Sequence, residues 1–169
     1  MSEIYSIVDS PIGGLLVGAA GPDEPLRRLW FTGAGVRRPA GGIDPAWRRD
    51  DDAFEPVRRQ LRGYFDGERR TFELELDLIG SEWERRVWGA LREIPYGETR
   101  SYGELAARLG TGGAARAVGL ANSRNPVAVI VPCHRVIGAD GSLTGFGGGI
   151  PRKRTLLDLE AGRLALTAV

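Results

Sequence analysis

The chain has 169 residues, of which 42% are hydrophobic and 27% charged, and its formal net charge is +1. This length allows one ordinary domain or two small ones, and the composition excludes a disordered or fibrous chain. The N-terminus lacks the basic start of a signal peptide, and no apolar run could span a bilayer. One cysteine and one histidine cannot make an internal disulfide or a four-ligand zinc site. We therefore expect a cytoplasmic protein with no membrane partner and no structural metal.

Charge is distributed unevenly along the chain. Residues 1–80 carry 11 Arg and 14 Asp or Glu, whereas residues 81–169 carry 12 Arg or Lys and 8 Asp or Glu. Between residues 100 and 154 the basic residues outnumber the acidic ones by 8 to 2. A basic second half suits a polyanionic partner, although surplus arginine is also typical of a solvated surface.

The first 80 residues predict strands and one helix. IYSIV, GLLVGAA and LRRLWF alternate with turn residues, as in a small antiparallel meander over residues 4–31. A glycine-rich loop follows at 33–45. Apolar residues then recur at helical spacing from Phe54 to Phe65, ahead of Gly67. TFELELDL, residues 71–78, alternates apolar and acidic residues as a half-buried strand does.

From Ser81 the pattern changes to helices. SEWERRVWGALREI opens with a capping box of Ser81 and Glu84, and SYGELAARLG opens with one of Ser101 and Glu104. After the turn GTGG, AARAVGLANSR predicts a further helix over residues 114–124. Two short helices joined by a glycine-containing turn are a candidate helix-turn-helix, although most such pairs never contact nucleic acid.

The last third predicts a buried segment, a loop and a helix. NPVAVIVPC, residues 125–133, is an apolar run bounded by turn residues and indicates a buried strand or extended segment. GSLTGFGGG, residues 141–149, contains glycines that let a backbone turn tightly or lie against a flat ligand. PRKRTLLDLEAG predicts a final helix with Pro151 in its first turn and Gly162 past its end.

Cys133 and His134, the only cysteine and the only histidine, are adjacent. A thiol becomes nucleophilic when a base or a positive charge favours its thiolate. Successive side chains of an extended segment point to opposite faces, so a water or a local turn at Pro132 would have to carry the proton between them. His134 would also need an acceptor, for which we nominate Glu160. The competing interpretation is an inert core cysteine.

PCHRV, residues 132–136, with NPVAVIV before it and GSLTGFGGG and PRKRTLLDLE after it, resembles the active-site region of the methylated-DNA–protein-cysteine methyltransferases, or O6-alkylguanine-DNA alkyltransferases. SYGELA and RAVGLAN match the helix-turn-helix of that family, and REIPYGETR matches the segment before it. The resemblance covers residues 81–162. Residues 1–80 resemble the family's variable N-terminal domain only in length and order of elements.

The resemblance implies an α/β (α+β) fold: a ribonuclease H-like domain with a small antiparallel sheet over 1–80, a mostly helical, winged-helix-like domain over 81–162, and a tail over 163–169. It also implies a single-turnover methyltransferase that repairs O6-alkylguanine in double-stranded DNA. The alkyl group would move irreversibly to Cys133 after base flipping, without a cofactor. The protein would be a monomer, and the sequence leaves open its cooperative self-association on DNA and the range of alkyl groups accepted.

The resemblance assigns roles to matched positions. His134, through a water and oriented by Glu160, would take the proton of Cys133. Tyr102 would protonate or hydrogen-bond the departing guanine and would press on the adjacent DNA phosphate, and Arg116 would fill the gap left by the flipped base. The further assignments are bracing of the turn by Asn125, DNA contacts by Ala115, Ser123 and Arg124, a base pocket of Asn122, Phe146 and the backbones of Val136 and Gly147, and support from Arg135 and Lys153. Singly, each of these positions also fits an ordinary structural role.

Two departures and three alternatives bear on this hypothesis. Phe146 stands where many members have tyrosine, and Gly147 stands where some have serine. A non-catalytic lesion sensor would have tryptophan in place of Cys133. A cysteine hydrolase would need an oxyanion hole and an acyl pocket, and a helix-turn-helix regulator leaves the thiol unexplained. Arg37 and Arg38 in the 33–45 loop are candidate DNA contacts, although we expect that loop to be inert.

Overall fold

The computed structural model describes residues 2–33, 36 and 42–165. Arg37 and Arg38 of the predicted loop, and residues 166–169 of the predicted tail, lie outside them. The N-terminal half holds a sheet with the strand order β3-β2-β1-β4. Its strands are β1 (Ile4–Val8), β2 (Leu15–Ala19), β3 (Leu26–Phe31) and β4 (Arg48–Arg49). The first three pair antiparallel, as the predicted meander does, and β4 joins β1 in parallel.

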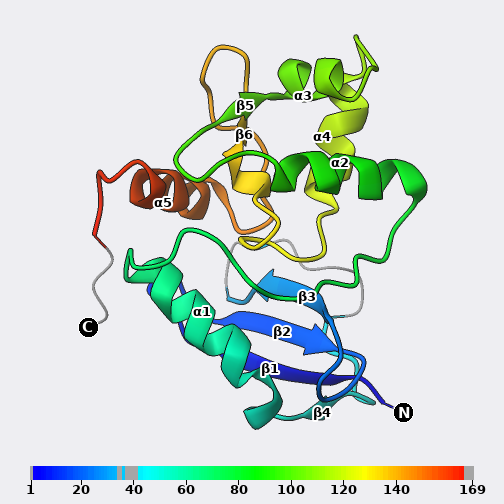
Figure 1. Ribbon diagram of the computed structural model, residues 1–169, viewed down its shortest axis with the longest axis vertical. Coiled ribbons are helices and arrows are strands. Elements are labelled where there is room, and N and C mark those ends of the chain that lie inside the picture. The colour runs from blue at the N-terminus through cyan, green and yellow to red at the C-terminus, as the bar shows by residue number, and fades with distance from the viewer. Residues whose placement is uncertain (1, 34–35, 37–41, 166–169) are drawn as a thin grey trace.

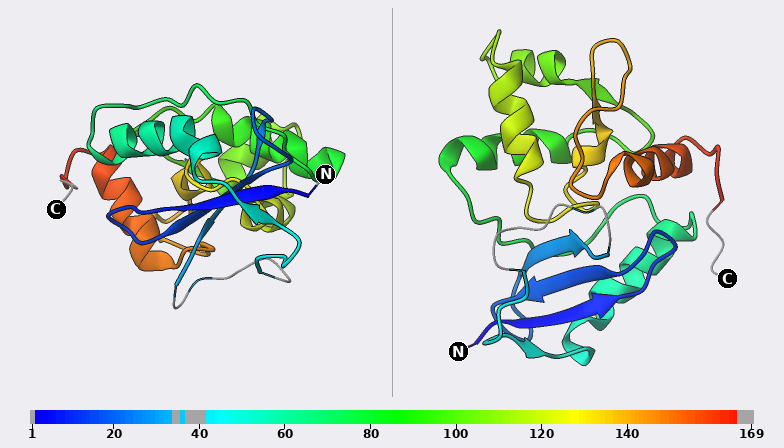
Figure 2. Two further views of the ribbon diagram at one scale, coloured as in Figure 1. Left: turned by 90° about the horizontal axis from the view of Figure 1, so that it is seen from below. Right: turned by 180° about the vertical axis from the view of Figure 1, so that it is seen from behind.

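Helix α1 (Glu55–Phe65) follows a short 3-10 helix, η1 (Asp52–Phe54), and lies across one face of the sheet (Figures 1 and 2). It buries the apolar positions that the spacing predicts, among them Leu61 and Tyr64, and Gly67 adopts a φ of +77° just past its end. One continuous cluster of buried apolar side chains joins this helix and the sheet to the C-terminal half. The two halves therefore share a core.

Helices dominate the C-terminal half. In chain order the elements are α2 (Glu82–Arg92), β5 (Arg100–Ser101), α3 (Tyr102–Arg108), α4 (Ala115–Ser123), the 3-10 helix η2 (Cys133–Arg135), β6 (Val136–Ile137) and α5 (Ile150–Glu160). Both predicted capping boxes are present, at the starts of α2 and α3. Helix α4 packs on α3 and on α2, where the indole Nε1 of Trp88 donates to the carbonyl of Ala121 at 2.9 Å. In the described part of the chain, none of the helices has the length and apolar character needed to cross a membrane.

The outer edge of β3 receives two extended segments, each through a single residue. Leu26 forms a parallel bridge with Leu76, and Leu29 forms one with Val127. The strand predicted over 71–78 is therefore wrong: the segment runs beside β3 but pairs with it only at Leu76. Two segments share one six-residue edge, so neither has room for a full strand. The second segment carries the chain toward Cys133.

The buried strand or extended segment predicted over 125–133 is also wrong, because the chain turns back on itself after Val127. The N–H of Val131 donates to the carbonyl of Val127 at 3.0 Å, and Val129 adopts a φ of +71°. Asn125 closes this turn, since its Nδ2 donates to the carbonyl of Val131 at 2.7 Å and its Oδ1 accepts from the N–H of Val127 at 3.0 Å. The predicted burial is confirmed, for residues 127–136 are buried throughout.

Candidate active site

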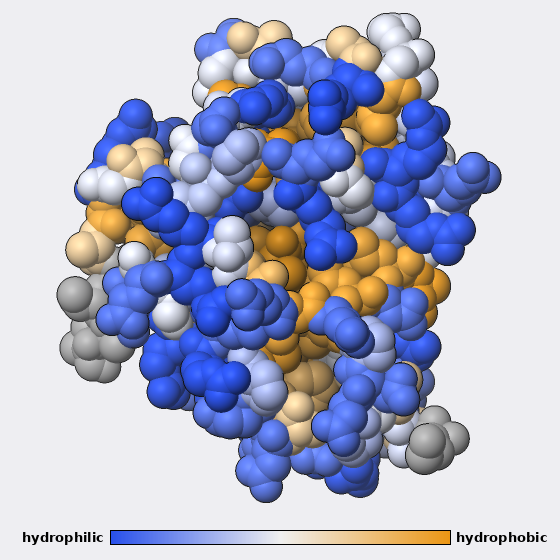
Figure 3. Space-filling view, in the orientation of Figure 1, coloured by the Kyte–Doolittle hydropathy of each residue, from blue (hydrophilic) through white to orange (hydrophobic). Residues whose placement is uncertain are grey.

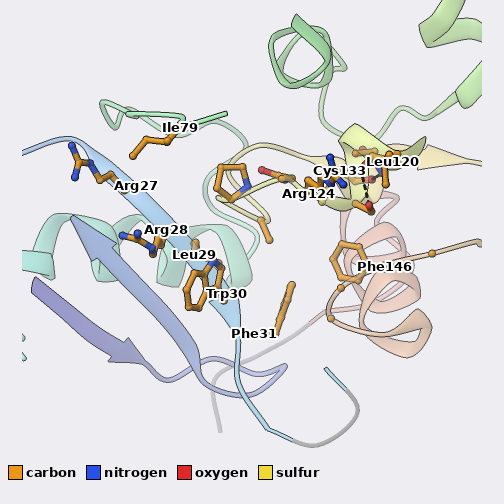
Figure 4. Close-up of a pocket in the computed structure, with 18 residues that line it drawn as sticks. Arg27, Arg28, Leu29, Trp30, Phe31, Ile79, Leu120, Arg124, Cys133 and Phe146 are labelled. Atoms are coloured by element: carbon orange, nitrogen blue, oxygen red, sulfur yellow. Dashed lines mark hydrogen bonds between the residues drawn. The ribbon is translucent and has the colours of Figure 1, made fainter. Parts of the chain in front are cut away.

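Cys133 borders a cavity of about 610 Å³ that both halves of the molecule line. The N-terminal half contributes β3 residues, and the C-terminal half contributes the end of α4 and the loop before α5. In Figure 4, Phe31 and Phe146 approach from opposite sides, with ring centroids 5.3 Å apart and an edge-to-face arrangement. On the face shown in Figure 3, apolar side chains also gather along the junction of the two halves. A flat apolar ligand would thus find aromatic walls above the thiol.

The backbone at Cys133 is a 3-10 turn and not the extended segment from which the sequence argument started. Residues 133–135 wind tightly after Pro132, and the carbonyl of Cys133 accepts from the N–H of Val136. The alternation expected for a strand therefore does not apply to the Cys133–His134 pair. The turn instead leaves the His134 side chain completely buried, in contact with the last residue of α5.

His134 Nε2 lies 2.8 Å from Oε2 of Glu160. An ionised carboxylate only accepts hydrogen bonds, so Nε2 carries the proton and Nδ1 keeps its lone pair. Nδ1 is buried and has no hydrogen-bond partner among the described residues. Burial lowers the pKa of His134, although the Glu160 hydrogen bond and charge oppose that shift. The imidazole is therefore neutral near pH 7, with one nitrogen able to accept a proton.

Glu160 is the centre of a buried ionic cluster. Arg135 donates from Nε to Oε1 at 2.7 Å and from Nη2 to Oε2 at 3.0 Å, and its Nη1 donates to the carbonyl of Ile94 at 2.7 Å. Burial alone would raise the pKa of Glu160. The hydrogen bonds and charges of His134 and Arg135 outweigh it and hold that pKa well below its usual range. Glu160 is thus a fixed carboxylate, as the sequence predicted when it paired this residue with His134.

The thiol itself is not preset as a thiolate. Burial raises the pKa of Cys133, and the nearby Asn125 side chain and the Lys153 charge offset this only in part. Near neutral pH the thiol therefore keeps its proton and needs a base to lose it. Asn122 contributes a weak hydrogen bond from Nδ2 to the carbonyl of Cys133 at 3.4 Å.

Lys153 supports the site from behind. Its buried Nζ donates to the carbonyls of Val136 at 2.6 Å and Thr144 at 3.0 Å, and burial lowers its pKa. Lys153 thereby joins the strand after the thiol to the loop before α5. Val136 does not line the cavity, and its N–H and carbonyl are both engaged within the protein. A carbonyl oxygen has two lone pairs, so the predicted backbone contact between Val136 and a guanine edge stays a prediction.

The predicted DNA-facing residues lie on α3 and α4. Arg116 is exposed in the first turn of α4, next to Ala115, whereas Ser123 and Arg124 follow at its far end and line the cavity. Arg124 also pairs with Glu84 at 3.6 Å. Tyr102 begins α3, and its hydroxyl donates to the carbonyl of Thr144 at 3.2 Å. Asn122, Phe146 and Gly147 line the same cavity as Cys133.

Two family models match the chain. The model described as 6-O-methylguanine DNA methyltransferase, DNA binding domain, covers residues 82–162. The model described as 6-O-methylguanine DNA methyltransferase, ribonuclease-like domain, covers residues 4–78. The chain belongs to the 6-O-methylguanine DNA methyltransferase family. The resemblance read from the second half of the sequence is thereby confirmed, and it extends to the first half.

Individual members of the 6-O-methylguanine DNA methyltransferase family are similar over nearly the full length. The methylated-DNA–protein-cysteine methyltransferase of Mycolicibacterium paratuberculosis is 55% identical over 92% of this chain and 91% of its own. That of Methanosarcina acetivorans is 48% identical over 92% of this chain and 97% of its own. The crystal structure of Mycobacterium tuberculosis OGT in complex with DNA matches with a TM-score of 0.85 at 52% identity, covering 95% of this chain and 94% of that one.

Sequence reasoning missed the contribution of the N-terminal half to the site. Phe31 walls the cavity, and the Tyr64 hydroxyl donates to Glu160 Oε2 at 2.6 Å. In the sequence both residues fit a plain core pattern, and only the rule that a buried tyrosine hydroxyl needs a partner signalled Tyr64. Within residues 2–33, 36 and 42–165, no group of three or more His, Cys, Asp or Glu side chains could hold a metal ion.

Proposed function

We propose that the chain repairs O6-alkylguanine in double-stranded DNA by direct, irreversible transfer of the alkyl group to Cys133 Sγ. The observation that carries the proposal is a buried thiol on an aromatic-walled cavity, beside a neutral imidazole that Glu160 orients. Membership of the 6-O-methylguanine DNA methyltransferase family supports it. So does a 52% identical relative whose crystal structure is in complex with DNA.

The reaction begins with removal of the thiol proton. His134 Nδ1 accepts that proton through a water molecule, and the imidazolium that forms faces the Glu160 carboxylate, which stabilises it. Sγ then attacks the alkyl carbon, so an S–C bond forms while the C–O6 bond breaks and its electron pair stays on the guanine. The Tyr102 hydroxyl donates a proton or a hydrogen bond to the departing base. No cofactor takes part in these steps.

Flipping brings the base to the thiol. An O6 substituent inside a stacked duplex cannot reach a buried sulfur, and extruding the base costs a few kcal/mol. The exposed Arg116 side chain fills the gap in the duplex, with Ala115, Ser123 and Arg124 along the same helix against the DNA backbone. Phe146 stacks on the base, the Gly147 N–H faces O6, and Asn122 completes the pocket. The Val136 carbonyl, which accepts one hydrogen bond from Lys153 Nζ, uses its second lone pair to contact the guanine edge.

The product limits the protein to one reaction. An S-alkyl thioether has no good leaving group, and the chain contains no second cysteine to accept the group. We propose a cytoplasmic monomer with domains over 1–80 and 81–162 and a tail over 163–169. Cooperative self-association on DNA is a separate question, which titration of DNA length against stoichiometry would answer.

Mass spectrometry tests the proposal directly. After incubation with duplex DNA bearing O6-methylguanine, the peptide containing Cys133 should gain one methyl group, in a one-to-one ratio with the lesions lost. Cys133→Ser serves as the matched control, because it preserves the shape of the site and should still bind the DNA without removing the lesion. Loss of the lesion with no methylated Cys133 peptide, or repair by Cys133→Ser, would contradict the proposal.

A further inference from the structure

The carboxylate that orients His134 also receives a hydrogen bond from the N-terminal half. Tyr64 lies on α1, 96 residues before Glu160 in sequence, and its hydroxyl donates to Oε2 at 2.6 Å. The Tyr64 side chain is completely buried. Its ring packs edge-to-face on Phe65 and Tyr96, with centroids 5.2 and 6.2 Å away, so the hydroxyl has a fixed direction.

Three donors meet at one oxygen. Oε2 of Glu160 takes His134 Nε2 at 2.8 Å, the Tyr64 hydroxyl at 2.6 Å and Arg135 Nη2 at 3.0 Å. Each donor withdraws electron density from the carboxylate and so weakens the hydrogen bonds that the carboxylate accepts from the other two donors. The contact with Tyr64 therefore moderates the His134–Glu160 bond and fixes the plane of the carboxylate from a second direction.

We propose that Tyr64 is a positioning residue for alkyl transfer, through which the N-terminal half holds Glu160 so that His134 keeps its proton on Nε2 and its base on Nδ1. This inference rests on the proposed function, because it assigns His134 the part of the base. Tyr64 is not among the residues that line the cavity, and its hydroxyl donates to Glu160, so we assign its effect to that carboxylate.

The charges around the pair give the direction of the effect. Glu160 raises the pKa of His134, whereas the charges of Arg135 on η2 and Lys153 on α5 lower it. The Glu160 charge also raises the pKa of Tyr64 on α1 and of Tyr96. When the Tyr64 hydroxyl is removed, the carboxylate loses a donor and draws more strongly on His134. The pKa of His134, which burial lowers in the intact protein, then rises toward its ordinary value. In mildly acidic solution, a smaller fraction of His134 is then neutral and able to accept a proton.

A single histidine makes this measurable without assignment, because the imidazole signals of the labelled protein all belong to His134. In an NMR titration, we expect the pKa of His134 to be higher in Tyr64→Phe than in the wild type. The acidic limb of the pH–rate profile for alkyl transfer should shift to higher pH by the same amount. The rate should be about threefold to tenfold lower at pH 6, and the loss should be smaller at pH 8. A purely structural role would lower stability and move neither curve.

Tyr96→Phe is the matched control, since it deletes the same atom from a neighbouring ring that makes no hydrogen bond to Glu160 in the described residues. The inference is overturned if Tyr64→Phe leaves the His134 titration unchanged, or if Tyr96→Phe moves it equally. Should Tyr64→Phe fold poorly, the wild type offers a second measurement: the Tyr64 hydroxyl proton should be downfield and exchange slowly, and a rapidly exchanging hydroxyl would overturn the inference. An inactive wild type with a shifted His134 titration in Tyr64→Phe would refute the alkyl transfer and leave the positioning intact.

Discussion

The two halves of the molecule contribute to the same cavity in different ways. The C-terminal half holds the thiol, the imidazole, the carboxylate and the helices α3 and α4. The N-terminal half, with an excess of acidic residues, contributes no nucleophile or base, yet it supplies the Phe31 wall and the Tyr64 hydroxyl. The thiol, imidazole and carboxylate thus all come from the C-terminal half, whereas the side chains that surround them come from both halves.

Contacts between the two halves also support the buried ionic cluster and the turn that leads to Cys133. A buried carboxylate and guanidinium are stable only if every remaining donor and acceptor is satisfied. Tyr64 meets one of those needs from α1, and the Leu29–Val127 bridge fixes the start of the turn that leads to Cys133. The N-terminal half is thus part of the active site without carrying the reaction.

The largest effect should come from breaking the ionic cluster inside the C-terminal half. Glu160→Gln removes the counter-charge of the buried Arg135 and replaces one of the two acceptor oxygens, which bind His134 and Arg135, with an amide that donates. We expect the free energy of unfolding to fall by about 3 kcal/mol and the transfer rate to fall about 100-fold. Urea unfolding and single-turnover kinetics measure the two losses. A variant as stable as the wild type would show that the cluster is not structurally important.

The pH dependence of the free energy of unfolding should report on the same ionic cluster. The folded-state pKa of Glu160 is lowered, so its contribution to stability is complete above the ordinary glutamate pKa and is lost as the pH falls through the folded value. The stability gap between wild type and Glu160→Gln should therefore stay constant from about pH 8 to pH 5 and narrow below about pH 4. A gap that widens on acidification would contradict the ionised state of Glu160.

The next effect separates DNA handling from chemistry. Arg116→Ala should slow repair of duplex DNA about 10-fold to 100-fold, but transfer from free O6-methylguanine base far less, because only the duplex requires flipping. Arg85→Ala, which removes a positive charge from the exposed face of α2, is the charge-matched control. Rates on both substrates give the answer. Equal losses on duplex and free base would show that Arg116 does not fill the gap.

The smallest effect should come from changing the cavity wall that the N-terminal half supplies. Phe31→Leu removes the edge-to-face contact with Phe146 and enlarges the cavity, at a cost of about 1 kcal/mol in stability. We expect the rate with O6-benzylguanine to rise about threefold relative to the rate with O6-methylguanine, since the larger group gains space. Trp30→Leu, also on β3 and in the cavity lining, tests whether the effect is specific to Phe31. An unchanged ratio would exclude Phe31 from alkyl selection.

Short-range signals made much of this molecule predictable. The capping boxes at Ser81 and Ser101 fix two helix starts through contacts three residues apart, and the structure contains both. The predicted pairing of His134 with Glu160 is also present; the need of the imidazole for an acceptor predicts it, and the family resemblance assigns the same role. Patterns within one element and motifs within one family were enough for these features.

Features that depend on distant partners were not predictable. Alternation over 71–78 is real, but whether a strand forms depends on how much of the β3 edge is free. The apolar run at 125–133 has strand composition, yet the Asn125 side chain closes it into a turn. Tyr64 reaches Glu160 across 96 residues, and nothing in the sequence around either residue points to the other.

Val129 links the reactivity of the thiol to the completion of folding. A branched residue at a φ of +71° costs about 1 to 3 kcal/mol and persists only where the surrounding structure determines it. Here the buried valine side chain and the Asn125 bonds hold it. In a partly folded chain the segment relaxes, and Cys133 is then an ordinary thiol without an oriented imidazole. The pairing of Cys133 with an oriented imidazole therefore exists only in the completed fold, because the turn at Val129 is held only there.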